Sequence, residues 1–328
     1  MKGGRPGTLL WVSVPGPELE SEDRRFLERI DPAGVVIFRE NVRSADQVRE
    51  LNMAIRQSCP SGRVLIAVDQ EGGRVARLRE GVPALPPMRA LGKTGDTVLI
   101  REAGRDLGRA LRGLGFDVDF APVLDVDSNS ANPVIGDRSF SSDPRSVGLL
   151  AMAFAEGLAS EGILPCGKHF PGHGDTDLDS HLALPVVSAP WEILESRELV
   201  PFRMAIDAGI PLMMTAHVVY PALDASLPAT LSRPIVSGLL RDRLGYKGLV
   251  LSDDLLMEAV ARSGVSVAAE SALAAGCDGL LVLRNRDAAL KVFDTVENKI
   301  REGWSPAIRA VERFDEWMRA NPFRGVGR

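Results

Sequence analysis

Eight short apolar runs recur along this chain of 328 residues, and each run is too brief to form a helix by itself. They are rich in valine, isoleucine, leucine and phenylalanine, and several show no alternation of apolar and polar residues. Such runs are typical of parallel strands that other elements cover on both faces. The runs span residues 8–12, 34–38, 64–68, 116–120, 164–169, 211–215, 249–251 and 279–283.

Helical patterns fill the segments between these runs. Apolar residues between positions 100 and 114 repeat at steps of three and four, with charged residues among them, which predicts an amphipathic helix. Ser232 can cap a second helix, which Gly245 can end. The segment 287–320 is also expected to be helical and to be followed by a loose tail at 321–328.

This alternation of strands and helices predicts the fold class α/β, as one (β/α)8 TIM barrel of parallel strands that spans residues 1–328. The alternative is a doubly wound open sheet, which the same alternation would also produce. No linker, low-complexity segment or internal repeat marks a second domain. We therefore expect a single domain with its active site at the C-terminal ends of the strands.

Charge and cysteine content limit the partners of the chain. The net charge is -5 and no basic run has aromatic residues among it, so we expect no nucleic-acid partner. The three cysteines, Cys59, Cys166 and Cys277, lie far apart, which favours a reducing compartment over a disulfide framework. No apolar stretch is long enough for a signal-peptide core or a membrane span. We expect a cytoplasmic protein without a membrane partner. The sequence does not predict its oligomeric state, and a monomer is compatible with it.

All histidines of the chain fall between positions 169 and 217, and three of them lie in one stretch. Residues 168–181 read KHFPGHGDTDLDSH, in which Gly172 and Gly174 disfavour a helix and indicate a loop. Histidine can both donate and accept a proton near neutral pH, so this clustering indicates acid–base chemistry. The four histidines are His169, His173, His181 and His217.

Polar side chains follow five of the predicted strands at their C-terminal ends. Since the active site of a barrel lies at that end, these side chains are expected to converge there. In chain order they are Asp69, Glu71 and Arg77, then Asp125 and Arg138, then Lys168 and His169, then His217, and then Asp253 and Asp254.

Asp253 is the best candidate for a nucleophile, because it directly follows a buried strand that would hold it rigidly. A helix cap or an ion pair with Lys168 is its alternative role. We expect Asp254 to point away, since side chains alternate along a strand, and to cap the following helix. Asp179 and His181 are two positions apart, so the carboxylate could orient the imidazole as in catalytic triads. A solvated loop ion pair is the alternative for these two.

The remaining polar residues are expected to bind a ligand. A buried Lys168 needs an anionic partner, which Asp253 or Asp69 could supply, and both Lys168 and His169 could donate to hydroxyl groups. Arg77 and Arg138 could fork onto vicinal hydroxyls or a carboxylate, although a surface ion pair is the more common use of an arginine. Asp69 could accept two hydrogen bonds from a diol.

Three further residues are expected to have supporting roles. Glu71 is a second-choice catalytic carboxylate, but its expected role is to stabilise the glycine turn beside it. His173 is expected to hold the loop in which it lies. His217 is expected to hydrogen bond the substrate or a water molecule inside the barrel.

The motif KHFPGHG at 168–174, with Asp179 and His181, resembles glycoside hydrolase family 3, and more closely its bacterial cytoplasmic β-N-acetylglucosaminidases of peptidoglycan recycling. The segments SDDL at 252–255, DQEGGR at 69–74, GDRSF at 136–140 and MTAH at 214–217 add to this resemblance. It implies that Asp253 is a nucleophile that forms a covalent glycosyl-enzyme. It also implies that His181, paired with Asp179, is the general acid and base. The residues implied to bind the N-acetylglucosamine ring are Asp69, Arg77, Arg138, Lys168 and His169.

Many members of this family carry a second domain that supplies a carboxylic acid, for which we expect no room in this chain, so the proton donor should come from the barrel. The implied activity is a retaining exo-β-N-acetylglucosaminidase without cofactor or metal, acting on a small carbohydrate such as GlcNAc-1,6-anhydro-MurNAc muropeptides. A phosphorylase and a β-glucosidase-type enzyme remain alternatives on the same scaffold. A metal-dependent barrel hydrolase using His169 and His173 is a third, although its usual histidine pair on the first strand is absent. A sugar-binding module without activity is the non-enzymatic alternative.

Overall fold

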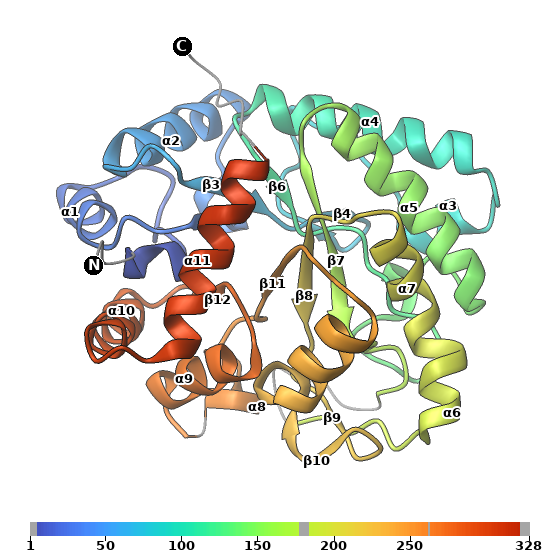
Figure 1. Cartoon of the computed structure of the whole chain (residues 1–328). Helices are drawn as coiled ribbons and strands as arrows, with labels where there is room; N and C mark the ends of the chain where they lie inside the picture. The colour runs from blue at the N-terminus through green and yellow to red at the C-terminus, as the bar shows by residue number, and fades with distance from the viewer. Residues whose placement is uncertain (1–4, 177–183, 262, 322–328) are drawn as a thin grey trace.

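Eight parallel strands form the predicted barrel in the computed structural model, which describes residues 5–176, 184–261 and 263–321 (Figure 1). Each of the eight apolar runs contains one strand. The sheet order is β11-β8-β7-β6-β3-β2-β1-β12. A parallel bridge between Leu251 and Gly279 joins the two ends of this order and closes the barrel. The strands are β1 (Leu10–Val12), β2 (Gly34–Ile37), β3 (Leu65–Val68), β6 (Val118–Asp119), β7 (Leu164–Phe170), β8 (Leu212–Thr215), β11 (Leu249–Leu251) and β12 (Leu280–Leu281).

Helices surround the strands, as Figure 1 shows, and most of them connect one strand to the next. The longer ones are α1 (Ser21–Ile30), α2 (Ala45–Ser58), α4 (Thr97–Gly113), α5 (Pro144–Ser160), α7 (Leu199–Asp207), α9 (Val265–Ala275), α10 (Arg286–Arg301) and α11 (Ser305–Ala320). Shorter turns are α3 (Met88–Gly92), α6 (Trp191–Ile193), the π-helix η4 (Leu194–Glu198) and α8 (Glu258–Ala261). Two hairpins, β4 (Gln70–Gly72) with β5 (Val75–Ala76) and β9 (Val219–Tyr220) with β10 (Asp224–Pro228), lie outside the barrel sheet.

The expected helices are present, with their ends close to the residues that the sequence indicated. Asp96 begins α4 by accepting hydrogen bonds from the N–H groups of Val98 and Leu99 at 2.9 and 3.0 Å. Ser232 Oγ accepts a hydrogen bond from the Ile235 N–H at 3.3 Å, just before the π-helix η6 (Pro234–Arg243). Of the expected loose tail, 321–328, only residue 321 lies within the described residues.

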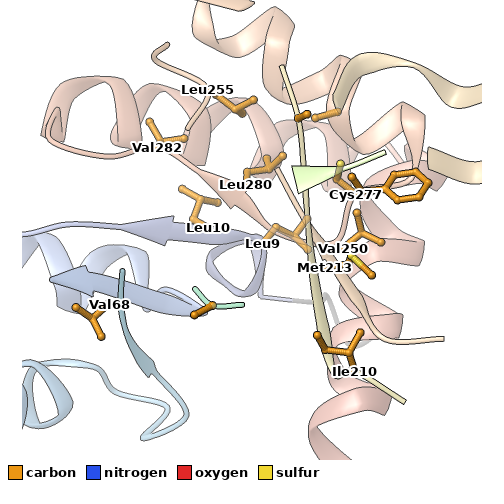
Figure 2. Close-up of a cluster of buried hydrophobic side chains, with 14 of the residues drawn as sticks. Leu9, Leu10, Val68, Ile210, Met213, Val250, Leu255, Cys277, Leu280 and Val282 are labelled. Atoms are coloured by element: carbon orange, nitrogen blue, oxygen red, sulfur yellow. The ribbon is translucent and has the colours of Figure 1, made fainter. Parts of the chain in front are cut away.

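The strands bury side chains on both faces, as parallel strands between helices should. Side chains on the outer face, among them Leu10, Val68 and Val250, pack in the layer between strands and helices (Figure 2). Inside the barrel, Trp11 contacts Phe120 with their rings 5.8 Å apart. Positions 34 and 279 are glycines, and no larger residue would fit there. A Cβ atom at either position would overlap the Trp11 ring.

The two ends of the barrel are closed differently. At the N-terminal end, α11 lays Phe314, Trp317 and Met318 against the interior cluster, and all three are buried. At the C-terminal end the loops leave a cavity of about 300 Å3. Apolar side chains of α11 thus cover the barrel interior at its N-terminal end, whereas a cavity with polar lining lies at its C-terminal end.

Candidate active site

The cavity at the C-terminal end contains six of the nine residues that the sequence singled out as catalytic or substrate-binding. They come from the ends of β3, β7 and β11 and from the loop after β6, which the closed barrel places around one space. The six are Asp69, Arg77, Arg138, Lys168, His169 and Asp253.

A buried ion-pair network forms one wall of this cavity. Lys168 Nζ lies 2.7 Å from Asp69 Oδ1 and 2.7 Å from Glu71 Oε1. Arg138 forks onto Glu71, with Nε 2.8 Å from Oε2 and one terminal nitrogen 2.7 Å from Oε1. Arg77 donates to Asp69 Oδ2 at 3.2 Å. Of the two partners expected for Lys168, Asp69 is therefore the one observed.

The network keeps Asp69, Glu71 and Lys168 charged. Burial alone would raise the pKa of the Glu71 carboxyl, but Arg138 and Lys168 outweigh burial and hold that pKa below its usual range. The same balance, with Lys168 and Arg77 as the cations, lowers the pKa of Asp69. Burial would lower the pKa of Lys168, yet Asp69 and Glu71 raise it. The wall therefore presents fixed charged donors and acceptors to a polar ligand.

The expectation for Glu71 was wrong. Its carboxylate does not serve the adjacent glycine turn but bonds Arg138 and Lys168. The turn is held instead by the backbone, since the Gly73 N–H donates to the Leu85 carbonyl at 3.0 Å. Glu71 could not be assigned from sequence because its partners lie 67 and 97 positions away.

Lys168 and His169 both line the cavity, although adjacent residues of a regular strand point to opposite sides. The peptide bond between them is cis. Asp125 accepts three hydrogen bonds in this region: one involves His169 Nδ1 at 2.7 Å, and the N–H groups of His169 and His173 donate the others at 3.1 and 2.7 Å. Burial would raise the pKa of Asp125, but His169 and these amides hold it below its usual value. Asp125 thereby orients the ring of His169. The other ring nitrogen, Nε2, is not held by Asp125.

We call residues 171–176, which follow β7, the histidine loop. Asn132 Nδ2 donates to the carbonyls of His173 and Gly174 at 2.8 and 2.9 Å. His173 Nδ1 lies 2.9 Å from Thr176 Oγ1, and burial lowers the pKa of His173 to about 4. His173 is thus a neutral residue that holds the loop, as the sequence led us to expect.

Asp253 lies two positions beyond the end of β11 and lines the cavity. Its Oδ1 accepts a hydrogen bond from the Asp254 N–H at 2.8 Å. Asp254 also lines the cavity, so the expectation that it points away was wrong. Nor does it cap α8, because its Oδ1 accepts from the N–H groups of Leu256 and Leu283 at 3.1 and 3.2 Å. Burial raises the pKa of Asp254 to about 7. Asp254 therefore ties the segment after β11 to the end of β12.

His217 is fully buried beside this segment. Its Nε2 lies 2.9 Å from the Asp254 carbonyl oxygen and its Nδ1 lies 2.8 Å from Thr230 Oγ1. Both ring nitrogens thus have protein partners. This geometry places His217 next to the backbone that carries Asp253.

Asp179 and His181 lie outside the described residues, so their expected pairing stays a prediction. The chain on both sides of them is held. On the near side, Thr176 Oγ1 donates to the His173 carbonyl at 3.2 Å within the histidine loop, and on the far side the Val187 N–H donates to the Val219 carbonyl of β9 at 2.9 Å. Within residues 5–176, 184–261 and 263–321, no group of three His, Cys, Asp or Glu side chains is arranged to hold a metal ion. None of the helices that the structure describes is long and apolar enough to cross a membrane.

A family model decides the identity of this barrel. The model described as the N-terminal domain of glycosyl hydrolase family 3 matches residues 6–313. The chain belongs to glycosyl hydrolase family 3. The resemblance read from the histidine motif is therefore confirmed.

This chain is similar to β-hexosaminidases over most of their length. A β-hexosaminidase from Tolumonas auensis is 43% identical over 305 residues, which cover 92% of this chain and 88% of the relative. A β-hexosaminidase from Bordetella parapertussis is 43% identical over 300 residues, covering 89% and 84%.

Solved family 3 structures share the fold. A β-N-acetylglucosaminidase from Paenibacillus superposes with a TM-score of 0.95 at 36% identity, with all of this chain but only 64% of that chain covered. NagZ from Neisseria gonorrhoeae, in complex with N-trifluoroacetyl-D-glucosamine, has a TM-score of 0.82 at 32% identity, with 96% and 99% covered. This chain thus spans under two thirds of the Paenibacillus enzyme and nearly the whole length of NagZ.

Sequence reasoning missed several residues of this family 3 site. Asp125 was noted at a strand end, but its hold on His169 and His173 was not predicted. Its signal is an isolated carboxylate within the apolar stretch 120–126, where a buried charge needs partners. Asn132 and Glu198, which contact the histidine loop, carry no comparable local signal.

Proposed function

We propose that this family 3 chain is a retaining exo-β-N-acetylglucosaminidase. The observation that supports this most strongly is the carboxylate of Asp253 on the wall of a cavity that Asp69, Lys168 and His169 also line. A cavity of about 300 Å3 suits one sugar ring better than a longer chain, which favours removal of a terminal residue. The β-hexosaminidase names of the relatives support N-acetylglucosamine as that residue.

In this proposal Asp253 attacks the anomeric carbon and forms a covalent glycosyl-enzyme. His181, as imidazolium, protonates the leaving oxygen, and as imidazole it then takes a proton from the attacking water. Asp179 orients His181 and stabilises its charged form. Most retaining glycosidases use two carboxyl groups, whereas a neutral imidazole avoids repulsion with Asp253 and tolerates an anionic leaving group.

The ion-pair wall is proposed to bind the sugar hydroxyls. Asp69 accepts from a diol, and Lys168 has three N–H donors, of which two go to Asp69 and Glu71. His169 can bond a hydroxyl through the ring nitrogen that Asp125 does not hold. Arg77 and Arg138 complete the polar set. For His217 we propose a positioning role through the Asp254 carbonyl in place of the direct substrate contact expected from sequence.

The physiological substrate proposed is a GlcNAc-1,6-anhydro-MurNAc muropeptide of cell-wall recycling, processed in the cytoplasm. Support comes from the resemblance to bacterial β-N-acetylglucosaminidases and from the similarity to NagZ. The histidine proposed above carries no negative charge in either of its forms, so it would also suit the acidic muropeptide.

The test compares an aryl β-N-acetylglucosaminide with an aryl β-glucoside, each with and without phosphate. Wild type, Asp253→Ala and the exposed control Asp242→Ala are assayed side by side. We expect cleavage of the first substrate only, independent of phosphate, lost in Asp253→Ala and kept in Asp242→Ala. Turnover that requires phosphate would point to a phosphorylase, and near wild-type activity in Asp253→Ala would refute the nucleophile.

A further inference from the structure

Glu198 is a wholly buried glutamate at the end of the π-helix η4. Its Oε1 accepts hydrogen bonds from Arg197 Nε at 2.6 Å and from Ser128 Oγ at 3.2 Å. Its Oε2 is buried and has no hydrogen-bond partner among the described residues. A buried carboxylate oxygen without a hydrogen-bond partner costs folding free energy. A role for Glu198 that offsets this cost is therefore expected.

The unpartnered oxygen lies against the histidine loop. Gly172 has a φ of 130°, and a Cβ atom there would lie 3.0 Å from both Cβ and Oε2 of Glu198. The Tyr220 hydroxyl donates to the Gly172 carbonyl at 2.5 Å, while the Gly172 N–H donates to the His169 carbonyl at 2.8 Å. Glu198 therefore packs directly on the backbone that continues from β7 into the loop.

A second contact runs from Glu198 to the far end of the loop. Arg197 bonds Glu198 through Nε and, through a terminal nitrogen, Asp175 Oδ2 at 2.5 Å. One guanidinium thus connects the buried carboxylate to the residue two positions before the segment 177–183. That segment contains Asp179 and His181 in the sequence.

We propose that Glu198 is a positioning residue, which holds the histidine loop through Gly172 and through Arg197 on Asp175. Asp179 and His181 follow the histidine loop in the sequence, so the hold on the loop should also affect the general acid and base. This part of the inference rests on the proposed function, which assigns those roles to them. Glu198 does not line the cavity and contacts no residue assigned to the sugar. Its effect should therefore fall on turnover rather than on substrate binding.

The charge of Glu198 should modulate this hold near neutral pH. Burial raises the pKa of Glu198 to about 7, and Arg197 offsets burial only in part. Since the folded pKa exceeds the ordinary value, the stabilisation is complete at low pH and is lost as the pH rises through about 7. The charged or titratable groups around the carboxyl are Arg197, Asp175, Tyr220 and Asp125, which in turn holds His169 and His173.

The first test is independent of activity. Hydrogen exchange of the amides at 171–176 is measured on the full chain for wild type, Glu198→Gln, Glu198→Ala and the control Glu195→Gln, whose carboxylate pairs with surface arginines of neighbouring helices. We expect at least about tenfold faster exchange in Glu198→Ala, and wild-type rates in Glu195→Gln. Glutamine should restore slow exchange at a given pH, and the protection factor, which is the intrinsic exchange rate divided by the measured rate, should then be independent of pH across about pH 6 to about pH 8. Wild-type rates in Glu198→Ala would overturn the proposal.

The second test measures kcat and KM on an activated aryl β-N-acetylglucosaminide at the same pH values. Because that leaving group needs no proton, His181 as an acid adds no alkaline loss, and the part of such a loss that Glu198→Gln removes reports on Glu198. We expect Glu198→Ala to lower kcat about tenfold with KM changed less than about twofold, and Glu198→Gln to restore kcat and remove the alkaline loss. Equal losses with alanine and glutamine would refute the pH dependence. If wild type itself is inactive, the proposed function fails, while the exchange experiment still decides the role of Glu198.

Discussion

The two ends of the barrel both contain buried carboxylates, but they use them differently. At the N-terminal end, Asp117 and Asp278 precede β6 and β12. Their Oδ2 atoms accept hydrogen bonds from the backbone of the neighbouring strand, from Ile66 N–H and Val250 N–H, both at 2.8 Å. Arginines neutralise them, Arg56 for the first and Arg241 and Arg313 for the second.

At the C-terminal end, Asp69 and Glu71 contact side chains. Their ion-pair partners are Lys168, Arg77 and Arg138, and all five residues border the cavity. A carboxylate bonded to a strand amide is occupied with holding strands in register. A carboxylate bonded to side chains at a cavity wall can share those donors with a ligand. For these four carboxylates, a bond to a strand amide, rather than burial, separates the role of holding strands from the role of binding a ligand.

The largest combined effect is expected for Lys168→Met. The change leaves Asp69 and Glu71 without their shared cation, and breaking a buried pair costs about 3–5 kcal/mol of unfolding free energy. Loss of a donor to the sugar should also lower kcat/KM by about 10²-fold or more. Urea unfolding and steady-state kinetics measure both, with the exposed Lys247→Met as control. A variant that loses neither would show that the wall does not depend on this cation.

A stability effect of similar size, without an effect on chemistry, is expected for Phe314→Ala at the N-terminal end. Phe314 is 2% exposed, and its truncation should leave a cavity that costs about 3–5 kcal/mol. The folded enzyme should keep kcat/KM within about twofold, because the side chain lies at the opposite end from the cavity. A large fall in kcat/KM of the folded variant would show that the N-terminal end of the barrel also contributes to activity.

A smaller, pH-dependent effect is expected at Asp117. Burial raises its pKa to about 6, despite the ion pair with Arg56. The carboxyl therefore contributes stability at low pH that is lost as the pH rises through about 6. Relative to wild type, Asp117→Asn should gain about 1–3 kcal/mol of unfolding free energy between about pH 4 and about pH 8. Urea titrations at several pH values measure this, and a constant difference would contradict it.

The sequence predicted the barrel because its signal is local. Each strand is an apolar run that can be read without knowing its neighbours, as at 64–68 and 249–251. Closure followed from their number, since parallel strands alternating with helices have few stable arrangements. The hairpins β4–β5 and β9–β10 were missed, because strands of two to five residues are too short to show such a pattern.

The sequence predicted which residues lie at the cavity, but not which of their side chains bond each other. Side chains at strand ends converge in any barrel, which is why Asp69, Lys168 and Asp253 could be placed at one cavity. Their partners depend on contacts between distant segments, and so the Glu71–Arg138 fork and the role of Asp254 could not be read from the chain. Asp125 shows the same limit.

The most direct test of this account compares Asp253→Asn with Asp278→Asn, one carboxylate from each end. The measurement is kcat/KM on the aryl β-N-acetylglucosaminide together with the urea midpoint of the same samples. We predict that Asp253→Asn loses at least about 10³-fold in kcat/KM and keeps its midpoint. Asp278→Asn should lower the free energy of unfolding by about 3–5 kcal/mol, and the urea midpoint with it, and keep kcat/KM within about twofold. Loss of stability with retained activity in Asp253→Asn, or loss of activity with retained stability in Asp278→Asn, would contradict the account.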